Sequence, residues 1–369
     1  MTAFAVVAPG LEPALTDELS ALGARPRAVT GGATFETDTD LLYRVHLHSR
    51  TAARIRVRIG EFPATTLEAL GAAVRRLPWD RYVHPRQPVK VEVASHRSRL
   101  RHRETIARKA EHAIRDAARV PRRTDAGRLP TDPVGVLIRI EDDRAEVSVD
   151  ASGDLLHRRG WRREHAGAPL RENLAAACLW LAQWSPEEPL LDPVCGSGTF
   201  PIEAATIALA RPPGADRTFG FHRWPSFDAA AWARVLAEAP EEPFAPTLFA
   251  SDRDARAITI ARANARRAGV EQAIRFDVQD LANAVAPAPS GLVIANPPWG
   301  GRIKGELAAM DLLSRALRGP LAGWRWALLA PRHIVPHRLG LSGEPIARFN
   351  DGGVDVVLHG GGPSGVTPV

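Results

Sequence analysis

The sequence predicts an α/β protein in which a doubly wound parallel sheet follows a mixed α+β region. From residue 170 onward, short apolar strand patterns alternate with helical patterns, which is typical of a parallel sheet covered by helices. A glycine-rich turn joins the first of these strands to a helix. The first 150 residues lack this regular alternation, so we expect a different architecture there.

The first 150 residues combine strand and helix patterns. The segment RIRVRI (54–59) alternates strictly between basic and apolar residues, which is typical of a strand with one buried face. Strands are expected at residues 4–8, 34–37, 54–59, 89–94 and 134–140, and helices at residues 11–22, 67–77 and 104–118. Residues 151–169 are expected to connect this region to the parallel sheet.

The second region is expected to hold six strands and four helices. The strands are predicted at residues 190–192, 248–252, 274–277, 292–295, 326–330 and 354–358, and the helices at 170–184, 200–210, 254–268 and 307–317. The proline-rich stretches 211–246 and 286–290 are expected to be loops. Residues 359–369 (HGGGPSGVTPV) are expected to form a disordered tail.

Composition narrows the class of protein. The 369 residues allow two or three domains, and the only cysteines are Cys178 and Cys195. The first residues lack the pattern of a signal peptide, and no apolar stretch approaches the length of a membrane span. We therefore expect a cytoplasmic protein with neither structural disulfides nor a membrane segment. The cysteines and scattered histidines have no zinc-ligand spacing, so no metal is expected.

Positive charge is concentrated in one segment. The chain carries a net charge of +6, and residues 86–128 alone contain 13 basic and 5 acidic residues. Such a segment suits a polyanion such as RNA, because arginine pairs bidentately with phosphate. A solvated face is the alternative, since only three of the 48 basic residues are lysine and arginine is this chain's usual cation. The candidate RNA-binding residues are Arg97, Arg99, Arg101, Arg103, Arg108 and Lys109.

The run DPVCGSGT (192–199) follows a predicted strand and opens a predicted helix. Gly196 and Gly198 permit a tight turn and a close approach of the backbone to a ligand, as in dinucleotide and adenosyl loops. The third glycine of the full pattern is missing, and the alternative is a purely structural strand–turn–helix joint. Asp192, Cys195 and Thr199 are the other candidate cofactor-binding residues of this run.

Two acidic residues follow the next predicted strands. Asp252 ends the strand at 248–252, where a carboxylate can accept hydrogen bonds from both ribose hydroxyls of an adenosyl group. The alternative is a helix N-cap, which explains Asp254 better than Asp252. Asp280 follows the strand at 274–277 and could accept a hydrogen bond from the adenine amino group, although a surface turn explains this residue better when it is taken alone.

The segment IANPPWG (294–300) is the strongest local signal. Pro297 and Pro298 fix the backbone and cannot donate, which leaves a carbonyl free to accept a hydrogen bond from a substrate amine. Asn296 adds a side-chain carbonyl, and Trp299 offers a flat face for a base. Carbonyl acceptors around an exocyclic amine direct its lone pair toward an electrophilic methyl group. A rigid Pro-Pro turn beside a buried tryptophan is the alternative.

Together these motifs resemble the class I S-adenosylmethionine-dependent amino-methyltransferases. Longer stretches are similar to the THUMP-domain RNA guanine-N2 methyltransferases: GLEPALTDEL (10–19), LHSRTAARI (47–55), DASGDLLHRRGWR (150–162), APLRENLAAACL (168–179), FPIEAA (200–205) and NPPWGGRI (296–303). The resemblance implies a ferredoxin-like part at 1–50, a THUMP RNA-binding domain at 51–150 and a Rossmann-like methyltransferase domain at 170–358.

The resemblance also implies which residues act. S-adenosylmethionine would be held by the glycine loop, Asp252 and Asp280, and the amine by residues 296–299, with Asn296 close to both ligands. The expected reaction is methylation of the N2 amine of a guanosine in structured RNA, with large-subunit rRNA favoured over tRNA. Trp299 stands where tyrosine is more usual, and Gly301 stands where the rRNA branch commonly has an acidic residue.

Three other functions stay open at this point. Adenine-N6 DNA methyltransferases and glutamine-N5 protein methyltransferases share the Asn-Pro-Pro-aromatic element, and an RNA-binding assembly factor could retain an inactive catalytic domain. The basic front region speaks for RNA against protein, but it discriminates less well against DNA. His46, His48 and His102 are expected at the surface or facing RNA. The sequence gives no indication of the oligomeric state.

Overall fold

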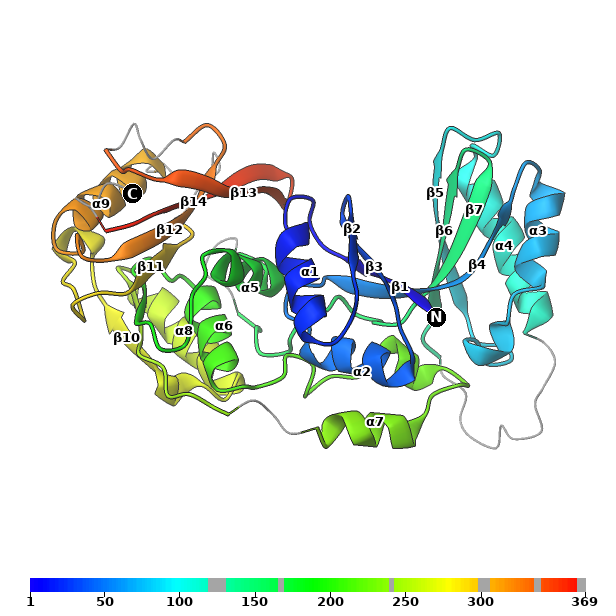
Figure 1. Ribbon diagram of the computed structural model, residues 1–369, viewed down its shortest axis with the longest axis horizontal. Helices are drawn as coiled ribbons and strands as arrows, with labels where there is room; N and C mark the ends of the chain where they lie inside the picture. The colour runs from blue at the N-terminus through cyan, green and yellow to red at the C-terminus, as the bar shows by residue number, and fades with distance from the viewer. Residues whose placement is uncertain (119–130, 165–168, 239–241, 298–305, 335–339, 364–369) are drawn as a thin grey trace.

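The structure is a computed structural model that describes residues 1–118, 131–164, 169–238, 242–297, 306–334 and 340–363. Two seven-stranded sheets form its framework. The first sheet runs from the centre to the right-hand end of Figure 1, the second lies at the left, and helices α1 and α5 pack against each other between them. The predicted α/β class is confirmed.

The first sheet has the strand order β2-β3-β1-β4-β7-β6-β5. Strand β4 joins its two halves, because residues 54–58 pair with β1 and residues 56–63 pair with β7. One continuous sheet therefore crosses the predicted boundary at residue 50. The strands are β1 (Thr2–Val6), β2 (Arg27–Val29), β3 (Gly32–Glu36), β4 (Arg54–Pro63), β5 (Val89–His96), β6 (Val134–Glu141) and β7 (Arg144–Asp150). The helices are α1 (Glu12–Ala21), α2 (Thr39–His48), α3 (Leu67–Arg75) and α4 (Arg103–Ala117), with a 3₁₀ turn η1 (Trp79–Arg81).

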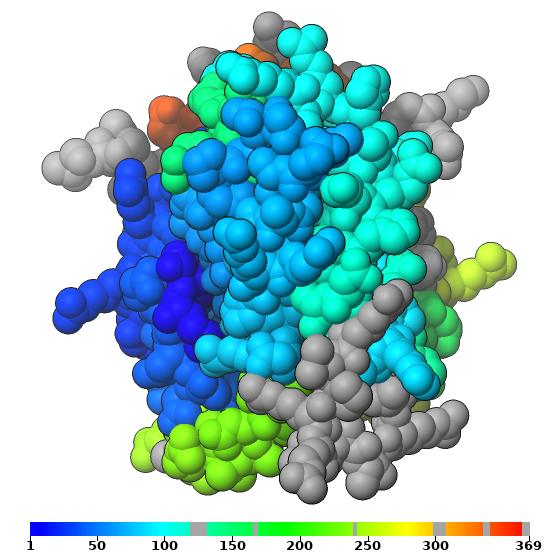
Figure 2. All heavy atoms as spheres, turned by 90° about the vertical axis from the view of Figure 1, so that its right-hand side faces the viewer, coloured from blue at the N-terminus to red at the C-terminus, as the bar shows by residue number. Residues whose placement is uncertain are grey.

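The alternation in β4 separates an apolar face of the first sheet from a polar one. Ile55 and Val57 are fully buried, whereas Arg54, Arg56 and Arg58 lie on the opposite face. Helices α3 and α4 cover the apolar face of the second half of the sheet. They form the end of the molecule that faces the viewer in Figure 2, with α7 below them. The arginines of RIRVRI thus lie on a face that these helices leave open.

The second sheet has the order β10-β9-β8-β11-β12-β14-β13. The five strands from β10 to β12 pair in parallel, and the hairpin of β13 and β14 adds antiparallel strands. The strands are β8 (Leu190–Asp192), β9 (Leu248–Asp252), β10 (Ile274–Val278), β11 (Leu292–Ala295), β12 (Arg325–Pro331), β13 (Glu344–Asp351) and β14 (Val354–Gly361). The helices are α5 (Glu172–Leu181), α6 (Thr199–Ala208), α7 (Ala229–Leu236), α8 (Ala255–Arg267) and α9 (Glu306–Arg318), and the 3₁₀ turns are η2 (Gly220–Arg223), η3 (Glu271–Ala273) and η4 (Leu281–Asn283).

The prediction of a loop over residues 211–246 is wrong, because this insertion contains η2 and α7 and packs on the front region. Helix α7 lies against α2, and the ring of Phe221 stacks on that of Tyr43 with centroids 4.3 Å apart. Trp232 of α7 meets the same tyrosine edge to face. Aromatic packing with a distant helix therefore folds a stretch whose prolines suggested a loop.

The predicted disordered tail begins too early. Residues 359–361 belong to β14, and His359 pairs with Leu328 of β12. Strand β14 lies between β12 and β13 and forms hydrogen bonds with both. This pairing extends the strand beyond Leu358, the last apolar residue of its predicted range. Residues 364–369 lie outside the described part of the chain.

His46 is buried, which contradicts its predicted place at the surface. Only 1% of the residue is exposed, and its ring lies edge-on to Phe219 and Phe221. Its Nδ1 lies 2.7 Å from the carbonyl oxygen of Leu42, and its Nε2 lies 3.3 Å from the Ser152 hydroxyl. Burial lowers the pKa of His46 from 6.5 to about 3, and the charges of Arg217 and His222 add to this effect.

This pKa predicts that the free energy of unfolding falls in acid. Below pH 6.5 the unfolded chain takes up a proton at His46 that the folded chain excludes down to about pH 3. The loss amounts to about 1.4 kcal/mol per pH unit across that window. In denaturant titrations between pH 6.5 and 4.5, His46→Gln should flatten the slope by this amount, whereas His112→Gln at an exposed position should not. Equal slopes in the wild type and His46→Gln would contradict the assignment.

Candidate cofactor and amine-binding site

The glycine loop leads from β8 into α6 with two left-handed residues. Gly198 has a φ of 86° and forms the N-cap of α6, and a Cβ there would lie 3.1 Å from the Cβ of Ala261. Gly196 has a φ of 54°, and no described atom lies within 4 Å of the position that its Cβ would take. Gly198 thus serves helix packing, while Gly196 leaves open space above the backbone, as a ligand cradle requires.

Asp252 faces this loop from the end of the neighbouring strand β9. Its Oδ2 accepts a hydrogen bond from the Gly196 N–H at 3.0 Å, and its Oδ1 accepts one from the Asp254 N–H at 3.0 Å. Asp254 is the N-cap of α8, as the sequence favoured. Since each carboxylate oxygen has a second lone pair, Asp252 retains acceptor capacity for a ligand beside the loop.

Asp192 and Cys195 support the loop from within. Asp192 is 2% exposed, and burial raises the pKa of its carboxyl well above the usual range, with the nearby charge of Asp252 adding to the shift. Burial likewise raises the pKa of the Cys195 thiol, so this cysteine is not activated as a nucleophile. Cys195 acts through its backbone: its N–H donates to Ser251 and its carbonyl accepts from Gly198.

Asp280 and Asn296 lie at the same edge of the sheet. Val278 pairs with Asp252, so Asp280 follows a strand end beside that of β9, where it caps η4 and remains exposed. Asn296 follows β11, which pairs with β8. The ends of β8 and β11 flank the point where the strand order reverses, which is where open α/β sheets bind ligands. Pro297 is buried, and Pro298 and Trp299 lie outside the described residues.

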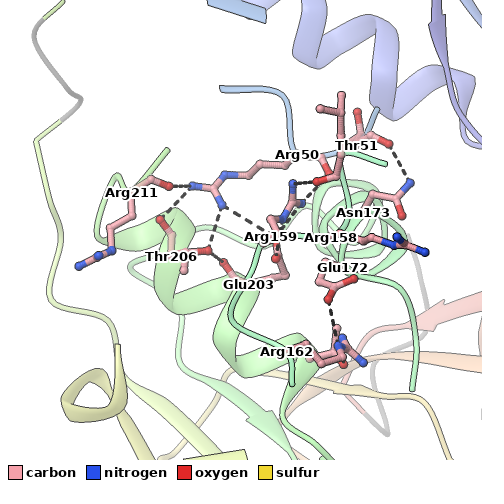
Figure 3. Close-up of polar contacts among 12 residues, drawn as sticks. Arg50, Thr51, Arg158, Arg159, Arg162, Glu172, Asn173, Glu203, Thr206 and Arg211 are labelled. Carbon is pink, nitrogen blue, oxygen red and sulfur yellow. Dashed lines mark hydrogen bonds and ion pairs between the residues drawn. The ribbon is translucent and has the colours of Figure 1, made fainter. Parts of the chain in front are cut away.

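Sequence reasoning missed a partly buried arginine that contacts the residue following the glycine loop. The Arg162 guanidinium pairs with Glu172 at 2.9 Å (Figure 3). It also donates to the Thr199 hydroxyl at 2.9 Å. Burial raises the pKa of Glu172, while the charge of Arg162 opposes that shift. Thr199 begins α6, so this network fixes the helix whose N-terminus carries the glycine loop. The sequence signal for this pair was that Arg162 and Glu172 lie in the stretches 150–162 and 168–179, which resemble the methyltransferase family.

A second buried network ties this helix to the front region. Arg159 forms a bidentate pair with Glu203 of α6 through contacts of 3.0 and 3.1 Å, and both side chains are almost fully buried. Arg159 also donates to the backbone carbonyl of Arg50 at 2.7 Å. The Arg50 side chain in turn donates to Thr206, again on α6. Figure 3 shows these residues converging from segments that are far apart in the chain.

The predicted RNA-binding residues lie at the far end of the molecule, and two of them are paired with acids. Arg97 contacts Asp142 at 2.8 Å, and Arg99 contacts Asp143 at 3.2 Å. The others are exposed, and α4, which carries three of them, faces the viewer in Figure 2. Arg101, Arg103, Arg108 and Lys109 are therefore the members of the run that remain available to an external anion.

In the parts of the chain that the structure describes, no group of three or more histidine, cysteine, aspartate or glutamate side chains could hold a metal ion. No described helix is long and apolar enough to cross a membrane.

Known proteins resemble the chain over its whole length. Residues 159–323 match the RMKL-like methyltransferase domain, and residues 2–56 match the RlmL ferredoxin-like domain. SMU.472, described as a candidate methyltransferase and solved in complex with SAH, is 31% identical with a TM-score of 0.86, over 99% of each chain. A protein from Listeria monocytogenes, described as a predicted N6-adenine-specific DNA methylase, is 30% identical with a TM-score of 0.86, over 97% of this chain and 95% of that one.

TrmN from Thermus thermophilus shares the fold, with 24% identity and a TM-score of 0.71 over 97% of this chain and 98% of that one. The chain belongs to the RMKL-like methyltransferase family, and an RlmL-type ferredoxin-like domain precedes its methyltransferase domain. The resemblance seen in the sequence is thus confirmed for the fold and for the cofactor. It is an S-adenosylmethionine-dependent enzyme of the class I type. The open space at Gly196 and the carboxylate of Asp252 at the adjoining strand end fit that cofactor.

We predict that Asp252→Ala weakens the binding of S-adenosylhomocysteine. If Asp252 accepts the ribose hydroxyls as the sequence predicts, the change removes two charge-assisted hydrogen bonds, each worth about 1.5–3 kcal/mol. It also frees the Gly196 N–H, so Asp252→Asn serves as a second variant that keeps one oxygen acceptor. Isothermal calorimetry on both variants measures the loss.

Asp254→Ala is the matched control for this test. It removes a carboxylate two residues away and costs about 1 kcal/mol of helix stability through the lost N-cap, but it should leave cofactor affinity unchanged. Unchanged affinity in a folded Asp252→Ala protein would show that Asp252 only supports the loop.

Proposed function

We propose that this enzyme transfers a methyl group from S-adenosylmethionine to the N2 amine of a guanosine in structured RNA, with large-subunit rRNA as the substrate. The observation that carries the proposal is the position of Asn296, which follows β11 at the sheet edge shared by the glycine loop and Asp252. An amine acceptor beside the cofactor loop is the arrangement that methylation of an exocyclic amine requires. The open polar face of the first sheet supports a nucleic-acid substrate rather than a protein.

Each residue at this edge has a distinct proposed role. The backbone of Gly196 and Gly198 and the first turn of α6 receive the cofactor, Asp252 accepts its ribose hydroxyls, and Asp280 accepts the adenine amine. The bound cofactor supplies an electrophilic methyl group. The Asn296 side-chain carbonyl accepts a hydrogen bond from the substrate amine and so directs the lone pair of its nitrogen.

Positioning is the main source of rate in this proposal. A displacement between two aligned centres gains chiefly from proximity, and no strong base is needed before the attack. The proton of the amine then leaves to Asn296, a backbone carbonyl or water. Trp299 is proposed to stack on the guanine, which must leave its helix or loop to reach the edge of the sheet.

Nucleoside analysis decides the substrate. Mass spectrometry of rRNA and tRNA from a deletion strain should show a methylguanosine missing from large-subunit rRNA. Loss from tRNA would support the tRNA alternative, and loss of N6-methyladenine from DNA would support the activity by which the Listeria protein is described. No change in any fraction would support a binding factor without activity.

We predict that Asn296→Ala abolishes methyl transfer while the protein still binds cofactor and RNA. The proposed hydrogen bond acts only in the reactive geometry, so its loss should lower the single-turnover rate rather than affinity. Asn283→Ala, at an exposed position on η4, is the control and should react normally. A normal rate in Asn296→Ala would remove this residue from the proposed amine site.

We also predict that reversing the charges of Arg99, Arg101 and Arg103 together weakens RNA binding in a salt-dependent manner. Affinity should fall with salt with a slope of about 0.7 per phosphate contact on single strands, and the variant should show a smaller slope. Cofactor affinity should not change, because these residues lie in the front region. An unchanged slope would mean that the run is a solvated face.

A further inference from the structure

A cavity of about 650 Å³ opens where the polar face of the first sheet meets the insertion of the methyltransferase region. Its walls come from β4, from the beginnings of β5 and β6, from residues 150–158 and from residues 217–224. The basic side chains that line it are Arg54, Arg56, Lys90, Arg158, Arg217 and Arg223. None of them belongs to the basic run at 97–109, so this is a second basic surface, and it lies between the two parts of the chain.

Most of these cations already have partners. Arg54 is paired with Asp150, Arg223 contacts Asp132 at 2.6 Å, and two of the Arg217 nitrogens donate to backbone carbonyls of residues 154–158. These contacts give the cavity fixed walls. Two lining arginines are not held in this way.

Arg56 is half-buried, and among the residues that the structure describes its side chain has no hydrogen bond or ion pair. Burial lowers the pKa of Arg56 and the neighbouring charge of Arg54 lowers it further, while the charge of Glu92 on the same wall offsets part of this shift. Within the described part of the chain, the Arg158 side chain has a single ion pair, at 3.9 Å from Asp154, and in Figure 3 it extends away from the Arg159–Glu203 pair. Both guanidinium groups therefore have donors that could form hydrogen bonds with an anion in the cavity.

The acidic side chains of the wall limit what the anion can be. Glu92 and Asp154 are largely exposed and only loosely paired, at 3.7 Å from Lys90 and 3.9 Å from Arg158. A compact polyanion would be repelled by these carboxylates. A phosphodiester carries a single charge and, in RNA, comes with a 2′-hydroxyl that can donate to a carboxylate. Guanidinium groups beside carboxylates therefore match the backbone of RNA better than that of DNA.

We propose that this cavity is an RNA-backbone subsite in which Arg56 and Arg158 bind a phosphate and Glu92 or Asp154 accepts a ribose 2′-hydroxyl. The inference rests on the proposed RNA substrate and adds an RNA contact where the front region meets the insertion of the methyltransferase region. RNA bound there touches both parts of the chain at once, because residues 217–224 belong to the insertion that packs on α2.

The test measures binding of a labelled RNA hairpin, and of a DNA hairpin of the same sequence, to the full chain across a range of salt concentrations. Arg56→Gln should weaken RNA binding about tenfold, as expected for one charge-assisted hydrogen-bonded contact, and lower the salt slope by about 0.7–0.9. Arg56→Lys should recover part of the affinity, because it keeps the charge without the bidentate fork. Glu92→Gln should reduce the preference for RNA over DNA.

Arg75→Gln is the matched control. It removes the same charge from an exposed arginine of α3, a helix on the opposite face of the sheet, and should leave both hairpins unaffected. Melting temperature and calorimetry with S-adenosylhomocysteine establish that each variant is folded and that its cofactor site is intact.

Each outcome bears on the proposal. If Arg56→Gln and Arg75→Gln have the same affinity and slope while the wild type methylates RNA, the subsite is wrong and the proposed function stands. If the wild type binds neither hairpin and methylates no RNA, both proposals fail. Equal weakening on RNA and DNA, with no effect of Glu92→Gln, would overturn the recognition of the ribose.

Discussion

The bidentate ion pair between Arg159 and Glu203 is the contact on which the arrangement of the molecule depends. Both side chains are almost fully removed from water, so each charge needs a partner, and Arg50 adds a contact of 3.8 Å to Glu203. Removing one partner of such a pair costs about 3–5 kcal/mol, because a buried charge is left without compensation. Arg159 also holds the carbonyl of Arg50, and Arg50 reaches α6 at Thr206. The front region and the helix of the cofactor loop thus share one buried network.

This network explains why several separate motifs occur together. Glu18, from the motif at 10–19, is buried and accepts hydrogen bonds from the Ser49 hydroxyl and the Arg50 N–H in the motif at 47–55. That motif then meets the motif at 150–162 through Arg159, which pairs with Glu203 of the motif at 200–205. In this chain, these four stretches therefore form one joint between its two parts.

The network around Arg159 and Glu203 fixes the relative position of two surfaces that differ in chemistry. The carboxyl edge of the second sheet brings together the glycine loop, Asp252 and Asn296, while the polar face of the first sheet presents arginines beside carboxylates. The insertion at 211–246 reinforces the relation, because its aromatic side chains pack on α2. An RNA that extends from one surface to the other would be positioned by the rigid protein between them, and positioning is the principal requirement of the reaction proposed here.

The sequence by itself determined the features that depend on neighbouring residues. Alternation and short apolar runs predicted most strands, and the glycines predicted the turn before α6. The spacing after β9 identified Asp254 rather than Asp252 as the N-cap of α8. All three features depend on backbone geometry within a few residues. Tertiary structure alone decided the burial of His46, the folding of the insertion onto α2 and the extension of β14 through Gly361. It also decided the pairing of Arg159 with Glu203 and the cavity around Arg56. These features arise from packing between segments tens to more than a hundred residues apart, which local periodicity does not encode.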